Sequence, residues 1–162
     1  MVKNWSNTLL VAYCHLPKII KNIDLGVERR VNSGFKSVHL MHGITNEQLY
    51  GEILELIGEK RKMVNLYIAV NTAFEGLDNS YALLIEMRYF KKMTLQEISD
   101  KFNVPLRTLY RRLDDARVRF QKQLGFVGFD VEYIEKEYGN NRFISLIHDN
   151  IDNEKFSPTY KL

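Results

Sequence analysis

The side chains best suited to chemistry in this sequence are arginines that recur at helical spacing near residue 110. Arg107 and Arg111 are four residues apart, so a helix would present both guanidinium groups on one side. A guanidinium can donate two hydrogen bonds to O6 and N7 of guanine, which discriminates against a wrong base by about 1–3 kcal/mol. The spacing therefore predicts a surface that reads base edges in the major groove of duplex DNA. Its base-reading residues are Arg107, Thr108, Tyr110 and Arg111.

Further polar side chains flank this surface, where the phosphates of a bound duplex would lie. Backbone N–H groups at the start of the preceding helix would add an anion-binding end. Asp114 and Asp115 would repel phosphates, so we expect only the N-terminal turns of the arginine-bearing helix to enter the groove. The phosphate contacts predicted from the sequence are Thr94, Gln96, Lys101, Arg112 and Arg117.

Local signals predict a helix-turn-helix that would position these residues, over about residues 94–120. Thr94 and Glu97 have the spacing of a capping box at the start of a short helix, residues 95–102. Asn103 tolerates the left-handed backbone of a tight turn, and Val104 would fill the angle before a second helix, residues 105–122. The side chains expected to face inward are Leu95, Ile98 and Phe102 on the first helix and Leu109, Leu113, Ala116 and Phe120 on the second.

These stretches resemble region four of bacterial sigma factors over about residues 77–123. Residues 89–99 are similar to that family's passage from its central helix into the motif, and residues 108–113 with Ala116 are similar to its recognition helix. The resemblance implies that Gln96 touches a backbone phosphate while Arg107, Tyr110 and Arg111 read bases. Two positions depart from the pattern: Pro105 replaces the usual Ser or Thr cap, and Asn103 replaces the usual Gly.

The first 76 residues do not resemble the promoter-melting second region of sigma factors, so we do not expect a self-sufficient sigma factor. Apolar residues recur at steps of three and four from Leu9 to Val27, and Pro17 should kink that helix or restart it. Residues 32–44 lack a period and predict a loop. Thr45 and Gln48 then form a capping box for a long helix that Gly76 closes. The sequence therefore predicts a helical hairpin arm, residues 1–76.

The remaining segments are also expected to be helical. Residues 80–91 are apolar nearly all round, which is typical of a helix at the centre of a core. Gly125 and Gly128 should end the second helix of the motif, and short helices are expected near residues 130–138 and 141–149. The predicted protein is thus all-α, with a hairpin arm (1–76), a helix-turn-helix domain (77–123) and a helical extension (124–162). The aromatic residues of the extension, which could pack or stack on bases, are Phe126, Phe129, Tyr133 and Tyr138.

Composition and charge fit this interpretation. Residues 79–123 carry ten basic and five acidic side chains, whereas residues 124–162 carry four and seven, so positive charge is concentrated around the motif. One cysteine and four histidines, including the pair His39 and His42, are too few and too scattered for a zinc site. We therefore expect no metal, cofactor or catalytic site. A lone cysteine and the lack of a long apolar run predict a cytoplasmic protein with no membrane partner.

The sequence as a whole predicts a sequence-specific transcriptional regulator that binds double-stranded DNA and is not an enzyme. Its architecture is similar to small sigma-like regulators of phages and integrative elements, which would make RNA polymerase a second partner. A homodimer formed through the arm is expected because a single helix-turn-helix seldom binds an operator tightly. Two alternatives stay open: an accessory factor for recombination, excision or packaging in a mobile element, and a non-catalytic helical scaffold.

Overall fold

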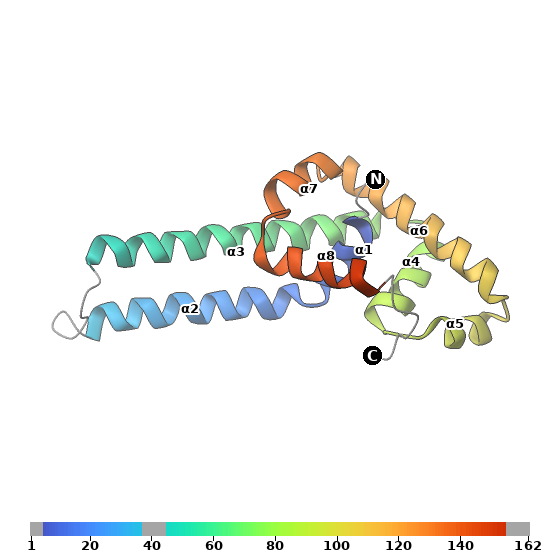
Figure 1. Cartoon of the computed structure of the whole chain (residues 1–162), viewed down its shortest axis with the longest axis horizontal. Coiled ribbons are helices and arrows are strands. Elements are labelled where there is room, and N and C mark those ends of the chain that lie inside the picture. Colours follow the sequence, from blue (N-terminus) through green and yellow to red (C-terminus); the bar gives the residue numbers. More distant parts are fainter. Residues whose placement is uncertain (1–4, 37–44, 155–162) are drawn as a thin grey trace. The chain divides into compact units, whose positions relative to one another are not determined.

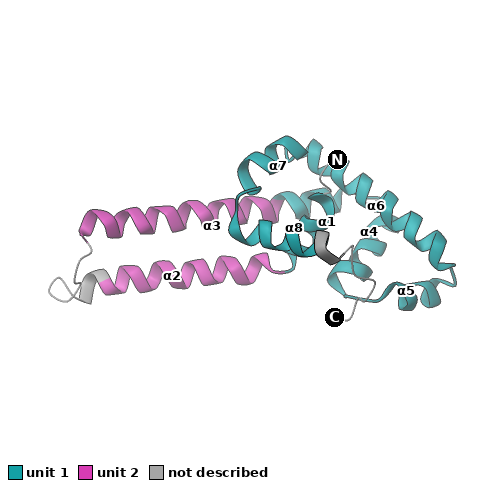
Figure 2. Cartoon of the chain, in the orientation of Figure 1, with its two compact units in different colours: residues 1–14, 69–162 teal, residues 15–68 magenta. Residues whose placement is uncertain are grey.

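The computed structural model describes residues 5–36 and 45–154, and these are organised in two compact units (Figures 1 and 2). One unit is formed by residues 15–68, and the other by the rest of the described chain. No strand occurs in the described ranges, so the all-α prediction is confirmed. The elements are α1 (Trp5–Tyr13), α2 (Leu16–Lys36), α3 (Asn46–Glu75), α4 (Asn79–Ile85), the π-helix η1 (Glu86–Phe90), α5 (Leu95–Phe102), α6 (Leu106–Phe126), α7 (Val131–Tyr138) and α8 (Arg142–Glu154).

In the unit formed by residues 15–68, α2 and α3 lie side by side as an antiparallel hairpin (Figure 1). Two ion pairs join the helices: Arg30 Nε lies 3.0 Å from Glu52 Oε2, and Lys60 Nζ lies 2.5 Å from Asp24 Oδ1. Both pairs are partly exposed, so each contributes little stability. The two pairs identify the side of α3 that faces α2.

The start of α3 is fixed by the capping box predicted from the sequence. The Thr45 N–H donates to Gln48 Oε1 at 2.9 Å, and the Gln48 N–H donates to Thr45 Oγ1 at 3.2 Å. The preceding boundary differs from the prediction, because α2 continues to Lys36 although a loop was expected from residue 32. An exposed helix can propagate through polar residues without an apolar period, since each added residue gains a backbone hydrogen bond. Residues 37–44 of the predicted loop lie outside the described residues.

The N-terminal apolar stripe is divided between two helices. The chain turns at Cys14 and His15, and α2 then starts at Leu16 with Pro17 in its first turn, where a missing N–H costs nothing. Of the two outcomes predicted for Pro17, a restarted helix is therefore the correct one. The short helix α1 packs on α6 and α8 rather than continuing into the hairpin.

Helix α1 is buried on nearly every side within its unit. Its Trp5 ring stacks on His148 of α8 with the ring centroids 4.5 Å apart. Thr8 Oγ1 and His148 Nδ1 are 2.8 Å apart and share a buried hydrogen bond. A helix that is apolar on nearly every side, as α1 is, is expected at such a central position. The fully buried apolar residues of α1 are Trp5, Leu9, Leu10 and Ala12.

The C-terminal helices have local caps. Asp130 Oδ1 accepts from the Tyr133 N–H at 2.8 Å at the start of α7, and Asn141 Oδ1 accepts from two N–H groups at the start of α8. Of the two glycines expected to stop the preceding helix, only Gly128 does so, with φ +89°, whereas α6 runs through Gly125 to Phe126. Among the described helices, none is both long enough and apolar enough to cross a bilayer.

Candidate nucleic-acid interface

The short helix α5 begins at the second predicted capping box. Thr94 Oγ1 accepts from the Glu97 N–H at 3.2 Å, and Glu97 Oε2 accepts from the Thr94 N–H at 2.7 Å and from the Thr94 hydroxyl at 2.9 Å. These hydrogen bonds, the backbone one first, hold the pKa of the Glu97 carboxyl below its usual value. The box fixes where α5 starts and so which side of it meets α6.

Replacing Glu97 with glutamine should make the stability of the protein less dependent on pH. A carboxyl whose pKa is lowered by folding contributes stability above its unfolded pKa of about 4.5, and that contribution is lost as the pH falls through the folded value. Glutamine can still accept from Thr94 but carries no charge. In thermal melts followed by circular dichroism at pH 7 and pH 3, the wild type should therefore lose more Tm than Glu97→Gln.

The matched control is Glu55→Gln, which removes an exposed carboxylate from α3, away from any cap. This variant should lose as much Tm on acidification as the wild type. Equal losses in Glu97→Gln and the wild type would show that the charge of Glu97 does not stabilise the start of α5.

The turn between α5 and α6 is a Schellman motif centred on Asn103. Asn103 is left-handed at φ 50° and ψ 45°, as predicted. Its N–H donates to Asp100 O at 3.3 Å, and the Val104 N–H donates to Ser99 O at 3.1 Å. The Ser99 hydroxyl donates to Val104 O at 2.6 Å and so closes the turn from the other side. Sequence reasoning missed Ser99, although a small polar residue one turn before the predicted left-handed position was a readable signal.

The angle between the helices is held by a small apolar core. Ile98 of α5 and Leu109 of α6 pack with Met87 of η1, and α6 continues the buried stripe that was predicted for it. Phe102 was expected to face inward, but its side chain is 39% exposed. It is the last residue of α5, where the chain turns away toward Asn103, so the ring is carried past the edge of the core. The buried residues of α6 are Leu109, Leu113, Ala116, Phe120 and Leu124.

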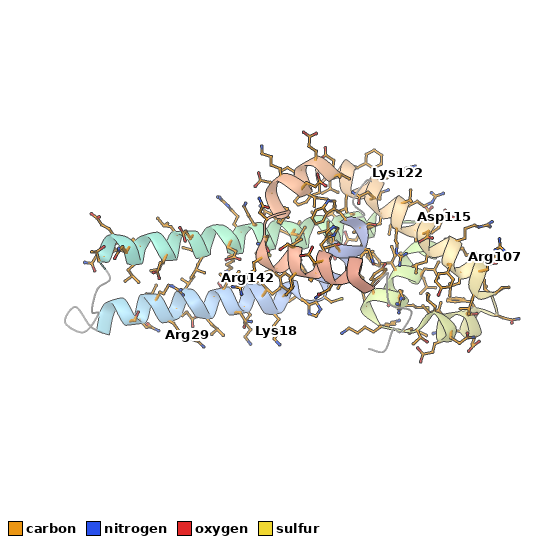
Figure 3. The ribbon with its side chains drawn as sticks, in the orientation of Figure 1. Lys18, Arg29, Arg107, Asp115, Lys122 and Arg142 are labelled. Carbon is orange, nitrogen blue, oxygen red and sulfur yellow. The ribbon has the colours of Figure 1, made fainter. Side chains whose placement is uncertain are left out.

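The opposite side of α6 presents the predicted base-reading residues. Arg107, Tyr110 and Arg111 are exposed and Thr108 is half-buried, and Figure 3 shows Arg107 projecting from the first turn of the helix. Within the described ranges, neither Arg107 nor Arg111 makes an ion pair or a hydrogen bond through its side chain. Their guanidinium groups are therefore available to a ligand on the outer side of α6.

Arg117 is half-buried and, unlike these two arginines, already has partners for its guanidinium. Its Nε donates to the Tyr89 hydroxyl at 2.7 Å, and its Nη1 donates to Asp114 Oδ1 at 2.8 Å. Tyr89 in turn donates to Asn7 Oδ1 at 2.5 Å, which joins α1, η1 and α6. Nε and Nη1 of Arg117 are therefore already engaged, and its predicted contact with a phosphate stays a prediction.

The π-helix η1 brings Tyr89 to this position. Residues 80–91 were predicted as one regular helix, but the Lys91 N–H donates to Glu86 O, one residue further back than in an α-helix. The Arg88 guanidinium donates to Met93 O at 3.1 Å, and Lys92 adopts φ 54° to end the element. The wider turn lets both Met87 and Tyr89 point into the core.

Comparison with known families agrees with this geometry. Residues 73–122 match the family described as sigma-70, region 4. The chain carries a sigma region-four-like helix-turn-helix. This family is one of DNA-binding domains and not of catalytic ones. No curated protein and no solved structure matches the chain.

The residues predicted to contact phosphates differ in whether their side chains already have partners within the described chain. Lys101 and Arg112 are exposed, and neither makes an ion pair with a described residue. Gln96 is exposed but its amide donates to Asp100 Oδ1 at 2.8 Å, while Thr94 uses its hydroxyl in the capping box. Gln96 can contact a phosphate only by giving up or sharing the bond to Asp100.

Two acidic residues follow the arginines on α6. Asp114 is paired with Arg117, which reduces its repulsion toward a phosphate backbone. Arg119, four residues after Asp115, lies 3.8 Å from Asp78 Oδ2, and its guanidinium carbon lies 4.6 Å from the centroid of the Tyr81 ring. These contacts tie the middle of α6 to the start of α4 and leave the N-terminal turns free.

The aromatic residues of the extension cluster with one another. Phe129 lies 5.0 Å from Tyr133 and 6.0 Å from Tyr138, measured between ring centroids. Burial raises the pKa of Tyr138, so its hydroxyl stays neutral. Packing therefore accounts for Phe129 and Tyr138, whereas Phe126, 83% exposed, and Tyr133, 39% exposed, still present ring surface to solvent. Among the described residues no cluster of His, Cys, Asp and Glu could hold a metal ion, and the His39–His42 pair lies outside them.

Proposed function

We propose that this protein is a sequence-specific, DNA-binding transcriptional regulator that reads its operator with the first turns of α6. The observation that carries the proposal is the exposed, unengaged pair Arg107 and Arg111 on the outer side of a region-four-like helix-turn-helix. Their spacing suits two successive base contacts in the major groove, and Tyr110 lies between them.

Phosphate contacts would come from both sides of this pair. Lys101 at the end of α5 and Arg112 on α6 supply free positive charge, and the N-terminal end of α5 with Gln96 supplies N–H groups. Arg117 is left out of this interface because its role is to join α6 to η1. Entry by the first turns alone keeps Asp115 away from the phosphates.

The protein would act with two partners besides DNA, in the cytoplasm of a bacterium. RNA polymerase is the first, by analogy with sigma factors and with the small regulators of phages and integrative elements. A second copy of the chain is the other, because one short recognition helix gives a limited contact and paired half-sites would double it.

Selection of bound fragments from the genome that encodes the protein tests this function directly. We expect enrichment of segments next to promoters, footprints of one motif, and an affinity that falls with salt at a log–log slope of about −2 to −4, as expected when two to four phosphates are neutralised. Footprints at attachment or packaging sites would instead support an accessory role in a mobile element. No binding at low salt would contradict DNA binding and leave a helical scaffold.

A further inference from the structure

A chain of hydrogen bonds connects the N-terminal helix α1 to α6. On α6, Arg117 Nε donates to the Tyr89 hydroxyl of η1 at 2.7 Å, and this hydroxyl donates to Asn7 Oδ1 of α1 at 2.5 Å. All three elements belong to the unit formed by residues 1–14 and 69–162 (Figure 2). We call the three side chains, Asn7, Tyr89 and Arg117, the polar link.

The polar link is short and directional. Tyr89 is 9% exposed, and the side chain of Arg117 is 24% exposed. The Tyr89 hydroxyl gives its proton to Asn7 and accepts from Arg117, so it is used both as donor and as acceptor. Each of these bonds needs a narrow range of distance and angle, and the guanidinium charge strengthens one of them. The link therefore fixes the orientation of the side chains that it joins.

Arg117 lies on the flank of α6, between the buried stripe and the outer side. At about 100° per residue, it is about 60° around the helix from buried Phe120 and about 120° from Arg111. On the other flank, about 100° from Phe120, Arg119 lies 3.8 Å from Asp78 Oδ2. The apolar contacts of the stripe are non-directional, so they resist separation of the helices more than rotation. A hydrogen bond on the flank opposes rotation of α6 about its own axis.

Rotation of α6 affects the reading of bases more than the binding of phosphates. A turn of about 10° moves an atom at the outer edge of a helix, about 6 Å from its axis, by roughly 1 Å. A guanidinium that bonds both O6 and N7 of guanine loses good geometry after such a shift. The attraction between a basic side chain and a phosphate falls only slowly with distance. Loss of the polar link should therefore lower sequence preference and leave binding to unrelated DNA nearly unchanged.

We propose that Asn7, Tyr89 and Arg117 are positioning residues that set the rotation of α6 and so place Arg107 and Arg111 against base edges. Through the polar link, α1 takes part in base reading without meeting DNA. This inference rests on the proposed function, because it concerns how the same arginines are aimed. It adds a part of the chain that lies outside residues 73–122, the range that matches region four.

The substitution Tyr89→Phe tests the proposal, because it removes the shared hydroxyl and keeps the ring. Fluorescence anisotropy measures the affinity for operator and for scrambled DNA in the cold, where the variant is fully folded. We expect operator affinity to fall about three- to tenfold, the effect that one lost hydrogen bond accounts for, with scrambled-DNA affinity unchanged. A merely structural role would lower the Tm but leave the ratio of the two affinities at this temperature unchanged.

Further variants on α1 supply the rescue and the control. Asn7→Asp keeps an oxygen that can accept from Tyr89 and should retain the wild-type preference, whereas Asn7→Leu should lower it. Adding Asn7→Leu to Tyr89→Phe should cost little further preference, because both substitutions break one link. Tyr13→Phe removes a hydroxyl of the same helix that donates to Asn71 Oδ1 of α3, outside the polar link, so it should bind as the wild type does.

Nitrogen-15 NMR spectra of the DNA-free full chain test the link itself. We expect a sharp Nε–H cross-peak from Arg117, identified by its absence in Arg117→Lys, because a hydrogen-bonded N–H exchanges slowly with water. The cross-peak should be lost in Tyr89→Phe and kept in Tyr13→Phe. Its survival in Tyr89→Phe would show that another group holds the guanidinium, and would overturn the role of the hydroxyl.

The outcomes on DNA separate this inference from the proposed function. A wild-type preference that persists in both Tyr89→Phe and Asn7→Leu overturns the positioning role and leaves the proposed function intact. Affinities that rise together for both DNAs in Tyr89→Phe would show that released Arg117 binds phosphate, which overturns it as well. Equal losses on both DNAs would contradict an effect on base reading. A wild type that prefers no sequence overturns both the inference and the proposed function.

Discussion

Replacing both Arg107 and Arg111 with alanine is expected to abolish operator recognition while leaving the fold unchanged. Both side chains are exposed and make no ion pair within the described ranges, so their loss removes no internal contact. Each bidentate base contact contributes about 1–3 kcal/mol of discrimination. Replacing both arginines should therefore weaken operator binding by about 2 kcal/mol or more, which is at least about thirtyfold in affinity. Fluorescence anisotropy with the selected operator and with scrambled DNA measures both affinities.

The control must remove the same charge from elsewhere on the molecule. Lys122→Ala/Lys136→Ala does so outside the proposed interface, because Lys122 lies toward the other end of α6 from Arg107 (Figure 3) and Lys136 lies on α7. This variant should lose little specificity, because diffuse charge contributes equally to all sequences. If both double variants lose operator and scrambled-DNA binding equally, α6 contributes only charge. If Arg107→Ala/Arg111→Ala binds the operator as the wild type does, α6 is not the reading helix.

Phe120→Ala is the single substitution expected to destabilise the DNA-binding unit most. Phe120 is fully buried on the inner side of α6, and removing a buried ring leaves a cavity that costs about 3–5 kcal/mol. For a chain of this size the loss corresponds to a fall in Tm of roughly 6–20 °C. Chemical denaturation and calorimetry measure both quantities.

Val118 offers a matched control two residues away on the same helix. Its side chain is 57% exposed, so Val118→Ala should change stability by about 0.5 kcal/mol or less. A loss below about 1 kcal/mol for Phe120→Ala would show that α6 is not anchored through this ring. The region-four-like unit would then be held mainly by the contacts of α1 and η1.

The parts of the site that sequence reasoning predicted are those that local chemistry specifies. Two capping boxes, the left-handed Asn103 and the inward stripe of α6 each depend on residues within a few positions of one another. The signals therefore survive in any tertiary context. The exposure of Arg107 and Arg111 follows from that stripe, because the outer side of a helix is set by its inner one.

The parts that were missed depend on residues far apart in the chain. Burial of α1 requires α6 and α8, which lie more than 90 residues later, and no local period encodes that contact. The position of Arg117 depends on Tyr89, which reaches it only because η1 is a π-helix. The inward orientation of Phe102 was predicted from helical spacing alone, but the turn that follows α5 leaves this residue exposed.

The burial of α1 also constrains how the protein is made. Trp5 is synthesised well before its stacking partner His148, because most of the described chain separates the two residues. The apolar surface of α1 therefore stays exposed until α6 and α8 have been synthesised, and closure of this unit is a long-range step. A nascent chain that stalls before residue 142 exposes Trp5, Leu9 and Leu10 together, which makes it a natural substrate for chaperones and proteases.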